Sequence, residues 1–206
     1  NFGILRRDLE IAKLVRHYTE KNNFPRHVFI YFAKNTNDAI IEIADTLKTV
    51  AGLSMSKQTT NQEVLVNIKR ENIPIEQYDI LREKCHEKGI EAFTELIYGL
   101  PGENYRSFVD GVKKSARNNV MVTIYPNMVL HGSEGGEKQF KEKYGIKTGY
   151  RVIPRYISSN NELLTLEYEE LVIETNDLPL EDFFRIRFFQ FLFYIFKSEL
   201  FLELSH

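Results

Sequence analysis

The sequence has no tryptophan, one cysteine and almost no net charge. Its 206 residues include 27 basic and 29 acidic side chains, which gives a formal charge of −2. A chain without a basic excess has no electrostatic field that would hold nucleic acid or an anionic membrane, so we expect neither as a partner. Cys85 is the single cysteine, which excludes an intrachain disulfide framework and any cysteine-rich metal site built by this chain alone.

Long apolar runs are also absent. No stretch reaches the roughly 18 apolar residues that span a bilayer, and the first residues lack the apolar run of a signal peptide. We therefore expect a cytoplasmic protein. The most apolar stretch, Phe183 to Leu202, is interrupted by charged residues and holds eight of the fifteen phenylalanines. A helix that is apolar on most faces is usually buried in a core or against a partner.

Helix-like and strand-like segments alternate through the first part of the chain. Helical apolar spacing marks residues 6–21, 38–49, 62–70, 75–88 and 105–118, and short β-rich runs mark 28–33, 51–57, 90–98 and 120–125. Four strands separated by helices predict parallel strands joined by right-handed crossovers. We therefore expect an α/β fold with about four βα units.

The pattern changes after Pro126. Residues 145–175 contain two β-like runs around Ser158–Asn161, a plausible turn, and the phenylalanine-rich helix follows. No linker-like segment separates this part from the βα units. It is expected to pack on the same core as a β-hairpin plus helix appendage.

The residues with chemical potential follow the predicted strands. In parallel α/β folds, ligands collect at the carboxyl ends of strands. After the second predicted strand, alternation groups Ser54, Ser56 and Gln58 on one face, although an ordinary polar turn is an equal interpretation. Tyr125 and Asn127 end the fourth strand and could contact substrate, although an ordinary strand exit is the simpler interpretation.

Glu95 lies in the middle of the third predicted strand. A carboxylate in a buried strand is costly unless it is paired or hydrogen-bonded. We expect its partner to be either a lysine or arginine, or the donor groups of a ligand. Gly99-Leu-Pro-Gly102-Glu103 then leaves the strand as a turn.

An ordered set of short motifs carries a family resemblance. Ser56-Lys-Gln58-Thr59, Ile68-Lys-Arg70-Glu-Asn-Ile73 and Glu95-Leu-Ile-Tyr-Gly-Leu-Pro-Gly-Glu103 follow one another in this order. The set resembles the second half of a radical S-adenosylmethionine (SAM) enzyme. The opening Asn1-Phe2-Gly3-Ile4 followed by Arg7-Asp8 resembles the cobalamin-associated branch of that superfamily.

The resemblance implies a partial TIM-like barrel and a SAM site. Residues 1–133 would be the carboxyl-terminal portion of the (βα) barrel, and residues 134–206 an extension packed on it. In the family, the residues matching Gln58 and Arg70 hold SAM. Arg70 would pair with the methionyl carboxylate, Gln58 and Glu95 would bind the ribose hydroxyls, and Ser56 would line the same wall. Where relatives often carry an acid that binds the SAM amino group, this sequence offers Tyr31 and Lys34.

The cluster-binding cysteines of the family are missing. Radical SAM chemistry needs a [4Fe–4S] cluster held by three closely spaced cysteines, and its cleavage of SAM yields a 5′-deoxyadenosyl radical. Because Cys85 stands alone and the chain begins with Asn1 rather than Met, we expect this to be a piece of a longer protein. The chain by itself would be inactive, and its first partner would be the missing amino-terminal half of the same protein.

Two functions remain from the sequence. The first is the carboxyl-terminal part of a radical SAM oxidoreductase or methyltransferase that acts on a small-molecule substrate, with SAM, a [4Fe–4S] cluster and, from the branch resemblance, cobalamin in the whole protein. The second is a non-enzymatic α/β module that binds a nucleoside-like ligand or a protein partner through its phenylalanine-rich helix.

Overall fold

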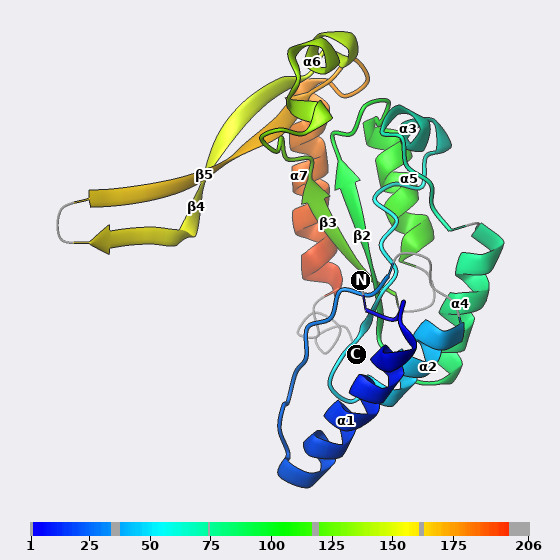
Figure 1. Ribbon diagram of the computed structural model, residues 1–206. Helices are drawn as coiled ribbons and strands as arrows, with labels where there is room; N and C mark the ends of the chain where they lie inside the picture. The colour runs from blue at the N-terminus through cyan, green and yellow to red at the C-terminus, as the bar shows by residue number, and fades with distance from the viewer. Residues whose placement is uncertain (1, 34–37, 74, 117–119, 161–162, 198–206) are drawn as a thin grey trace. The chain divides into compact units, whose positions relative to one another are not determined.

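The computed structural model describes residues 2–33, 38–73, 75–116, 120–160 and 163–197. Its elements, in chain order, are α1 (Arg6–Asn22), α2 (Asp38–Leu47), β1 (Leu53–Ser54), α3 (Gln62–Asn67), α4 (Ile75–Glu87), β2 (Ala92–Tyr98), α5 (Tyr105–Ser115), β3 (Met121–Pro126), the 3-10 turn η2 (Glu134–Gly136), α6 (Lys138–Tyr144), β4 (Lys147–Asn160), β5 (Leu163–Glu174) and α7 (Leu180–Lys197) (Figure 1).

The chain forms two compact units. The first unit comprises Asn1–Gln58, Glu71–Leu96 and Gly111–Thr123. The second unit comprises Thr59–Arg70, Ile97–Asp110 and Ile124–His206. The predicted division into residues 1–133 and 134–206 rests on the family resemblance and stays a prediction.

Three strands form a parallel sheet, as the alternation of helices and strands predicts. Their order is β1-β2-β3. Leu53 and Ser54 of β1 pair in parallel with Ala92 and Phe93 of β2, and the arrows of β2 and β3 point the same way (Figure 1). Along β2 the residues alternate between buried and half-buried, because successive side chains of a strand point to opposite faces.

The prediction of a strand over residues 28–33 is wrong. Its segment is extended, but only Phe32 makes a bridge, and that bridge is to Phe2 in parallel. The Phe2 N–H donates to the carbonyl of Tyr31 at 2.8 Å, and the Ala33 N–H donates to the carbonyl of Phe2 at 2.9 Å. One pairing residue is too few to make a ladder, so a sequence with strong β propensity stays an isolated bridge.

The core of the first unit is formed by residues of α1, α2 and α4 and of the segments around β1 and the start of β2. The apolar face of α2 supplies Ile40, Ile43 and Leu47, all almost fully buried. Helix α1 lies beside α2 (Figure 1). The carboxylate of Asp8 accepts the backbone N–H groups of Gly3 and Leu5 at 2.9 and 3.0 Å, so it fixes the entry to α1.

Local signals in the sequence set the ends of several helices. The Asn61 side chain accepts the backbone N–H of Glu63 at 3.0 Å and caps α3. Gly89 follows α4 with φ of 63°, the left-handed geometry that ends helices without a Cβ clash. These helices begin or end close to the predicted positions, because capping depends on residues near in sequence.

The second unit contains a long antiparallel ribbon. Strands β4 and β5 pair along their length, with Tyr150 opposite Glu170 and Val152 opposite Tyr168. Strand β4 runs through Asn160, so most of the predicted turn at Ser158–Asn161 is strand, and Asn161 lies outside the described residues. The Met128 bridge to Leu171 ties the segment after β3 to β5.

The phenylalanine-rich helix is α7, which ends at Lys197 within the described residues. One face packs inside the second unit: the ring of Phe183 lies 5.7 Å from that of Tyr98, and the Gln190 side chain donates to the Ile124 carbonyl at 2.8 Å. Among the described residues, no helix has both the length and the hydrophobicity that crossing a membrane requires.

Candidate functional site

The candidate site lies where β1 ends beside β2. The N–H groups of Leu53, Met55 and Gln58 donate to the carbonyls of Glu91, Phe93 and Glu95 at 2.8, 2.8 and 2.9 Å. This parallel register brings the Ser54-Met-Ser56 segment alongside the carboxyl-terminal half of β2. Ligands of parallel sheets collect at this end of the strands.

Ser56 and Glu95 meet on one face of the sheet. The Ser56 hydroxyl donates to Glu95 Oε2 at 2.7 Å, and the hydroxyls of Ser54 and Ser56 lie 2.8 Å apart. Both Glu95 and Ser56 are half-buried. Among the described residues no lysine or arginine pairs with Glu95, so its partner is a hydroxyl rather than the cation that was the simpler expectation.

Gln58 has an unusual backbone for its residue type. Its φ is 67°, in the left-handed region that non-glycine residues seldom adopt. Its N–H bonds to Glu95, and it makes an isolated parallel bridge to Leu96. The chain therefore turns at Gln58, four residues after β1 ends at Ser54. Glu95, which accepts the Ser56 hydroxyl through its side chain, also accepts the Gln58 N–H through its backbone carbonyl.

The other predicted site residues belong to the second unit. Arg70 is exposed after α3, and its N–H donates to the carbonyl of Leu65 at 2.9 Å. Tyr125 is an exposed residue of β3. The Asn127 side chain donates to the carbonyl of Gly99 at 3.0 Å, and its backbone carbonyl accepts the N–H of Val172. Asn127 thus joins the β2 exit to β5.

Glu103 is a buried carboxylate whose place in the sequence indicated no role beyond a turn. It is 1% exposed. The Thr59 hydroxyl donates to Glu103 Oε2 at 2.6 Å, and the Ser107 hydroxyl donates to Oε1. Burial raises the pKa of Glu103, while the hydrogen bonds from Ser107, Thr59 and Asn61 lower it. Thr59 and Glu103 both stand in the quoted motifs, but 44 residues apart, so only folding reveals their contact.

Lys57 lies between Ser56 and Gln58 in the sequence, and its environment shifts its pKa. Its ammonium nitrogen sits 3.2 Å from the centroid of the Tyr78 ring. Burial lowers the pKa of Lys57 to about 8; Asp79 raises it and Arg82 lowers it further. A lysine that is poorly hydrated and close to a second cation is costly to keep charged.

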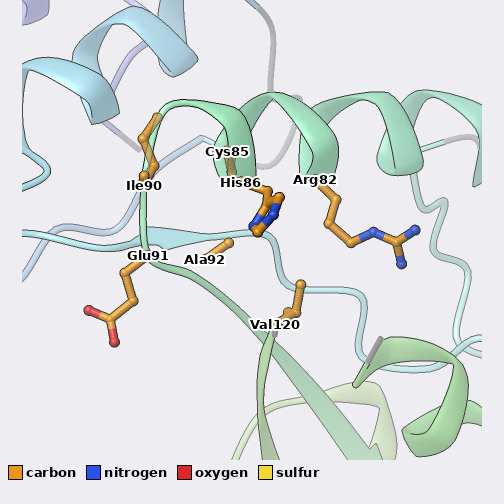
Figure 2. A pocket seen from close by; sticks show the side chains of 8 residues that line it. Arg82, Cys85, His86, Ile90, Glu91, Ala92 and Val120 are labelled. Carbon is orange, nitrogen blue, oxygen red and sulfur yellow. The ribbon is translucent and has the colours of Figure 1, made fainter. Parts of the chain in front are cut away.

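A separate cavity of about 240 Å³ lies near the start of β2. Its lining includes Arg82, Cys85, His86, Glu91 and Val120. Figure 2 shows Arg82 and Glu91 extending to opposite sides, with His86 between them. Burial raises the pKa of the Cys85 thiol to about 11, which makes it a poor nucleophile and metal ligand.

The described residues provide no group of side chains that could ligate an iron–sulfur cluster. Within the described residues, no three His, Cys, Asp or Glu side chains are grouped as metal ligands. Cys85 is a buried residue of α4, in the first unit. Of the residues offered for the SAM amino group, Tyr31 is exposed and Lys34 lies outside the described residues.

Comparisons with known proteins place these features in context. No family model matches the chain. It is 34% identical over 203 residues to the cobalamin-dependent radical SAM methyltransferase TokK of Streptomyces tokunonensis, an alignment covering 93% of this chain and 29% of that protein. It is 32% identical over 193 residues to the 2-(S-pantetheinyl)-carbapenam-3-carboxylate methyltransferase of Streptantibioticus cattleyicolor, covering 88% of this chain and 27% of that protein.

A solved structure shares the fold. The radical SAM methyltransferase TsrM of Kitasatospora setae, solved with cobalamin and a [4Fe–4S] cluster, matches with a TM-score of 0.53 and 16% identity over 70% of this chain and 28% of that chain. At that identity the match shows an α/β fold similar to that of radical SAM enzymes. The chain thus spans less than a third of the curated relatives it matches. The resemblance to radical SAM enzymes, including cobalamin-dependent methyltransferases, is confirmed.

Proposed function

We propose that this chain is the carboxyl-terminal part of the catalytic barrel of a cobalamin-dependent radical SAM methyltransferase, and that it supplies part of the SAM-binding wall. The observation that carries the proposal is the Ser56 hydroxyl bonded to Glu95 at 2.7 Å, on the motif the chain shares with the family. The 34% identity to such a methyltransferase supports it. Residues 1–133 form the partial barrel in this proposal, and residues 134–206 form the extension packed on it.

The residue types suit SAM. Glu95 is a carboxylate held by a hydroxyl and without a cation among the described residues, so it keeps acceptor capacity for ribose hydroxyls. Gln58 binds the same hydroxyls through its amide. Arg70 is exposed, and its planar guanidinium matches the methionyl carboxylate. Ser56 positions Glu95. When bound, SAM supplies the methyl group or, with a [4Fe–4S] cluster, the deoxyadenosyl radical.

The cluster belongs to other residues of the whole protein. Three thiolates are needed, and this chain has only Cys85, which is buried with a raised pKa. We assign the cluster, and the cobalamin that a relative's name records, to the remainder of a longer polypeptide. That polypeptide acts on a small organic substrate, which Tyr125 and Asn127 contact. The cytoplasm is its proposed setting.

In this proposal the segment 28–33 of the first unit is a contact surface for the rest of the longer polypeptide. Within the described residues the extended segment 28–33 makes one bridge, between Phe32 and Phe2 in parallel. The rings of Phe29 and Tyr31 stack edge to face at 5.0 Å and are 77% and 71% exposed. In this proposal the exposed aromatic pair is a contact surface for the rest of the longer polypeptide.

SAM titration of the whole, iron-reconstituted protein tests the assignment. We expect Glu95→Ala and Arg70→Ala each to weaken SAM binding at least about tenfold, as loss of a hydrogen bond to a charged group does. Glu91→Ala on the segment entering β2 and Arg26→Ala are matched controls, since both side chains are exposed. Unchanged affinity in both site variants would remove the SAM assignment and favour a non-enzymatic module that binds a nucleoside-like ligand or a protein partner.

A further inference from the structure

The segment that follows β1 contains a β-bulge. From Leu53 to Met55, the donors of successive backbone hydrogen bonds advance by two residues, and their acceptors on the β2 side also advance by two. From Met55 to Gln58 the donors advance by three residues, while the acceptors advance by two, from Phe93 to Glu95. One extra residue therefore lies between Met55 and Gln58. Bulges bend a strand, re-aim its side chains and are common beside active sites.

The hydroxyl of Thr94 bonds to the backbone of this bulge. In a regular parallel ladder, the Met55 carbonyl would accept the N–H of Glu95, because the bonds are evenly spaced along both strands. In the structure the Thr94 hydroxyl donates to the Met55 carbonyl at 2.9 Å. Thr94 and Met55 are both buried, and a buried carbonyl without a donor is costly. The threonine side chain thus supplies a donor at the point where the chain leaves the regular ladder.

Thr94 and Glu95 point to opposite faces of β2, because successive side chains of a strand alternate. Thr94 lies on the buried face, whereas Glu95 lies on the half-buried face and accepts the Ser56 hydroxyl at 2.7 Å. A ligand held by Glu95 would therefore lie across the strand from Thr94. Any effect of Thr94 on such a ligand has to pass through the bulge, which contains Ser56.

We propose that Thr94 is a positioning residue for the SAM-binding wall, and this inference rests on the proposed function. Its hydroxyl holds the bulge in the form that sets Ser56 against Glu95 and turns the chain at Gln58. Without this donor, the competing arrangement is the regular ladder, in which the Glu95 N–H takes the Met55 carbonyl. That arrangement has no bulge, so Ser56 would lose its place beside the Glu95 carboxylate.

SAM titration of the whole, iron-reconstituted protein tests the role of Thr94. Thr94→Val keeps the branched shape and removes the hydroxyl, so SAM affinity should fall about fivefold, as for loss of one hydrogen bond. Thr94→Ser keeps the hydroxyl and should bind SAM within about twofold of the wild type. Thr94→Val combined with Ser56→Ala should bind about as weakly as Ser56→Ala alone, because both changes remove the same contact with Glu95. Independent effects would multiply instead.

Thr175→Val is the matched control for a general loss of stability. Thr175 is a buried threonine of the second unit, and its hydroxyl oxygen accepts the N–H of Leu178 at 3.0 Å. This variant should have a lower melting temperature and an unchanged SAM affinity. If Thr175→Val weakens SAM binding as much as Thr94→Val does, the effect of Thr94 is one of overall stability and the positioning role is overturned.

The remaining outcomes separate this inference from the proposed function. If Glu95→Ala and Arg70→Ala weaken SAM binding but Thr94→Val does not, the SAM site stands and the positioning role is overturned. Losses that multiply in the double variant overturn it as well. Hydrogen exchange of the Gln58 amide, measured without SAM, tests the bulge itself. Exchange should be at least about fivefold faster in T94V and return to the wild-type rate in T94S; an unchanged rate in T94V overturns the proposal even if neither site variant affects SAM.

Discussion

Thr59 donates a hydrogen bond of 2.6 Å to the buried carboxylate of Glu103, and the Ser107 hydroxyl serves the other carboxylate oxygen. Thr59 Oγ1 also accepts the N–H of Asn61, the residue that caps α3. Glu103 therefore links the loop before α3 to the first turn of α5. No cation acts on Glu103 within the described part of the chain, so burial and the hydrogen bonds from Ser107, Thr59 and Asn61 decide its ionisation.

Glu103 should make the free energy of unfolding depend on pH. Because burial raises the pKa of Glu103 in the folded state, folding favours the protonated form. Its stabilising contribution is present below the ordinary value of 4.5 and is lost as pH rises through the raised pKa. Glu103→Gln should remove this dependence, so the variant gains on the wild type in urea denaturation as the pH rises from 4.5 towards neutral. A constant difference between the two proteins across that range would contradict this account.

Gly102 should not tolerate a side chain. Its φ is 89°, and a Cβ there would lie 2.8 Å from the Asn67 side-chain nitrogen, which itself bonds the Pro101 carbonyl. We expect Gly102→Ala to destabilise the protein by about 1–2 kcal/mol, from strain alone. Gly132→Ala also has positive φ but open space around it, so it separates backbone strain from the clash. Equal melting temperatures for G102A and the wild type would show that the loop relaxes.

Lys57 should titrate near pH 8. Burial lowers its pKa to about 8, and the unfolded value is near 10.5. The group thus contributes stability above the unfolded pKa, and this is lost as pH falls through about 8. Lys57→Met should be more stable than the wild type at neutral pH and lose this dependence. Isotope-labelled dimethyl-lysine spectra would report the pKa of Lys57 directly, with Lys57→Met identifying its signal. An ordinary value for Lys57 would refute the burial argument.

Ser56 should matter to SAM affinity more than to folding. Ser56→Ala removes the donor to Glu95 from a half-buried position, so on the proposed function SAM affinity should fall about fivefold, close to the roughly 1 kcal/mol of one hydrogen bond. Ser54→Ala is the control, since it removes the neighbouring hydroxyl and leaves the Ser56 contact with Glu95 in place. Isothermal titration of the reconstituted whole protein distinguishes the two. Equal losses in both variants would show that the serine pair, rather than the Glu95 contact, is responsible.

The prediction of elements succeeded where the signal is local. Helical spacing predicted α3 and α4 closely, because spacing depends on residues within a few positions. The cap at Asn61 is seen only in the structure. Residues 28–33 failed as a strand although their composition favours one, because a strand needs a partner and, among the residues the structure describes, only Phe2 pairs with them. Strand β1 is also shorter than predicted, because its ladder with β2 covers only Leu53 and Ser54 and pairing returns only as an isolated bridge at Gln58.

By itself, the sequence determined the order of the elements, the SAM-type motifs and the lack of cluster cysteines, because composition and spacing are properties of the chain alone. Only the tertiary structure decided that Glu95 meets Ser56, 39 residues away, rather than a cation, and that Glu103 is buried against Thr59. It also decided that α7 buries one apolar face and exposes another. The physical reason is that partners and burial follow from contacts between distant segments, which periodicity cannot encode.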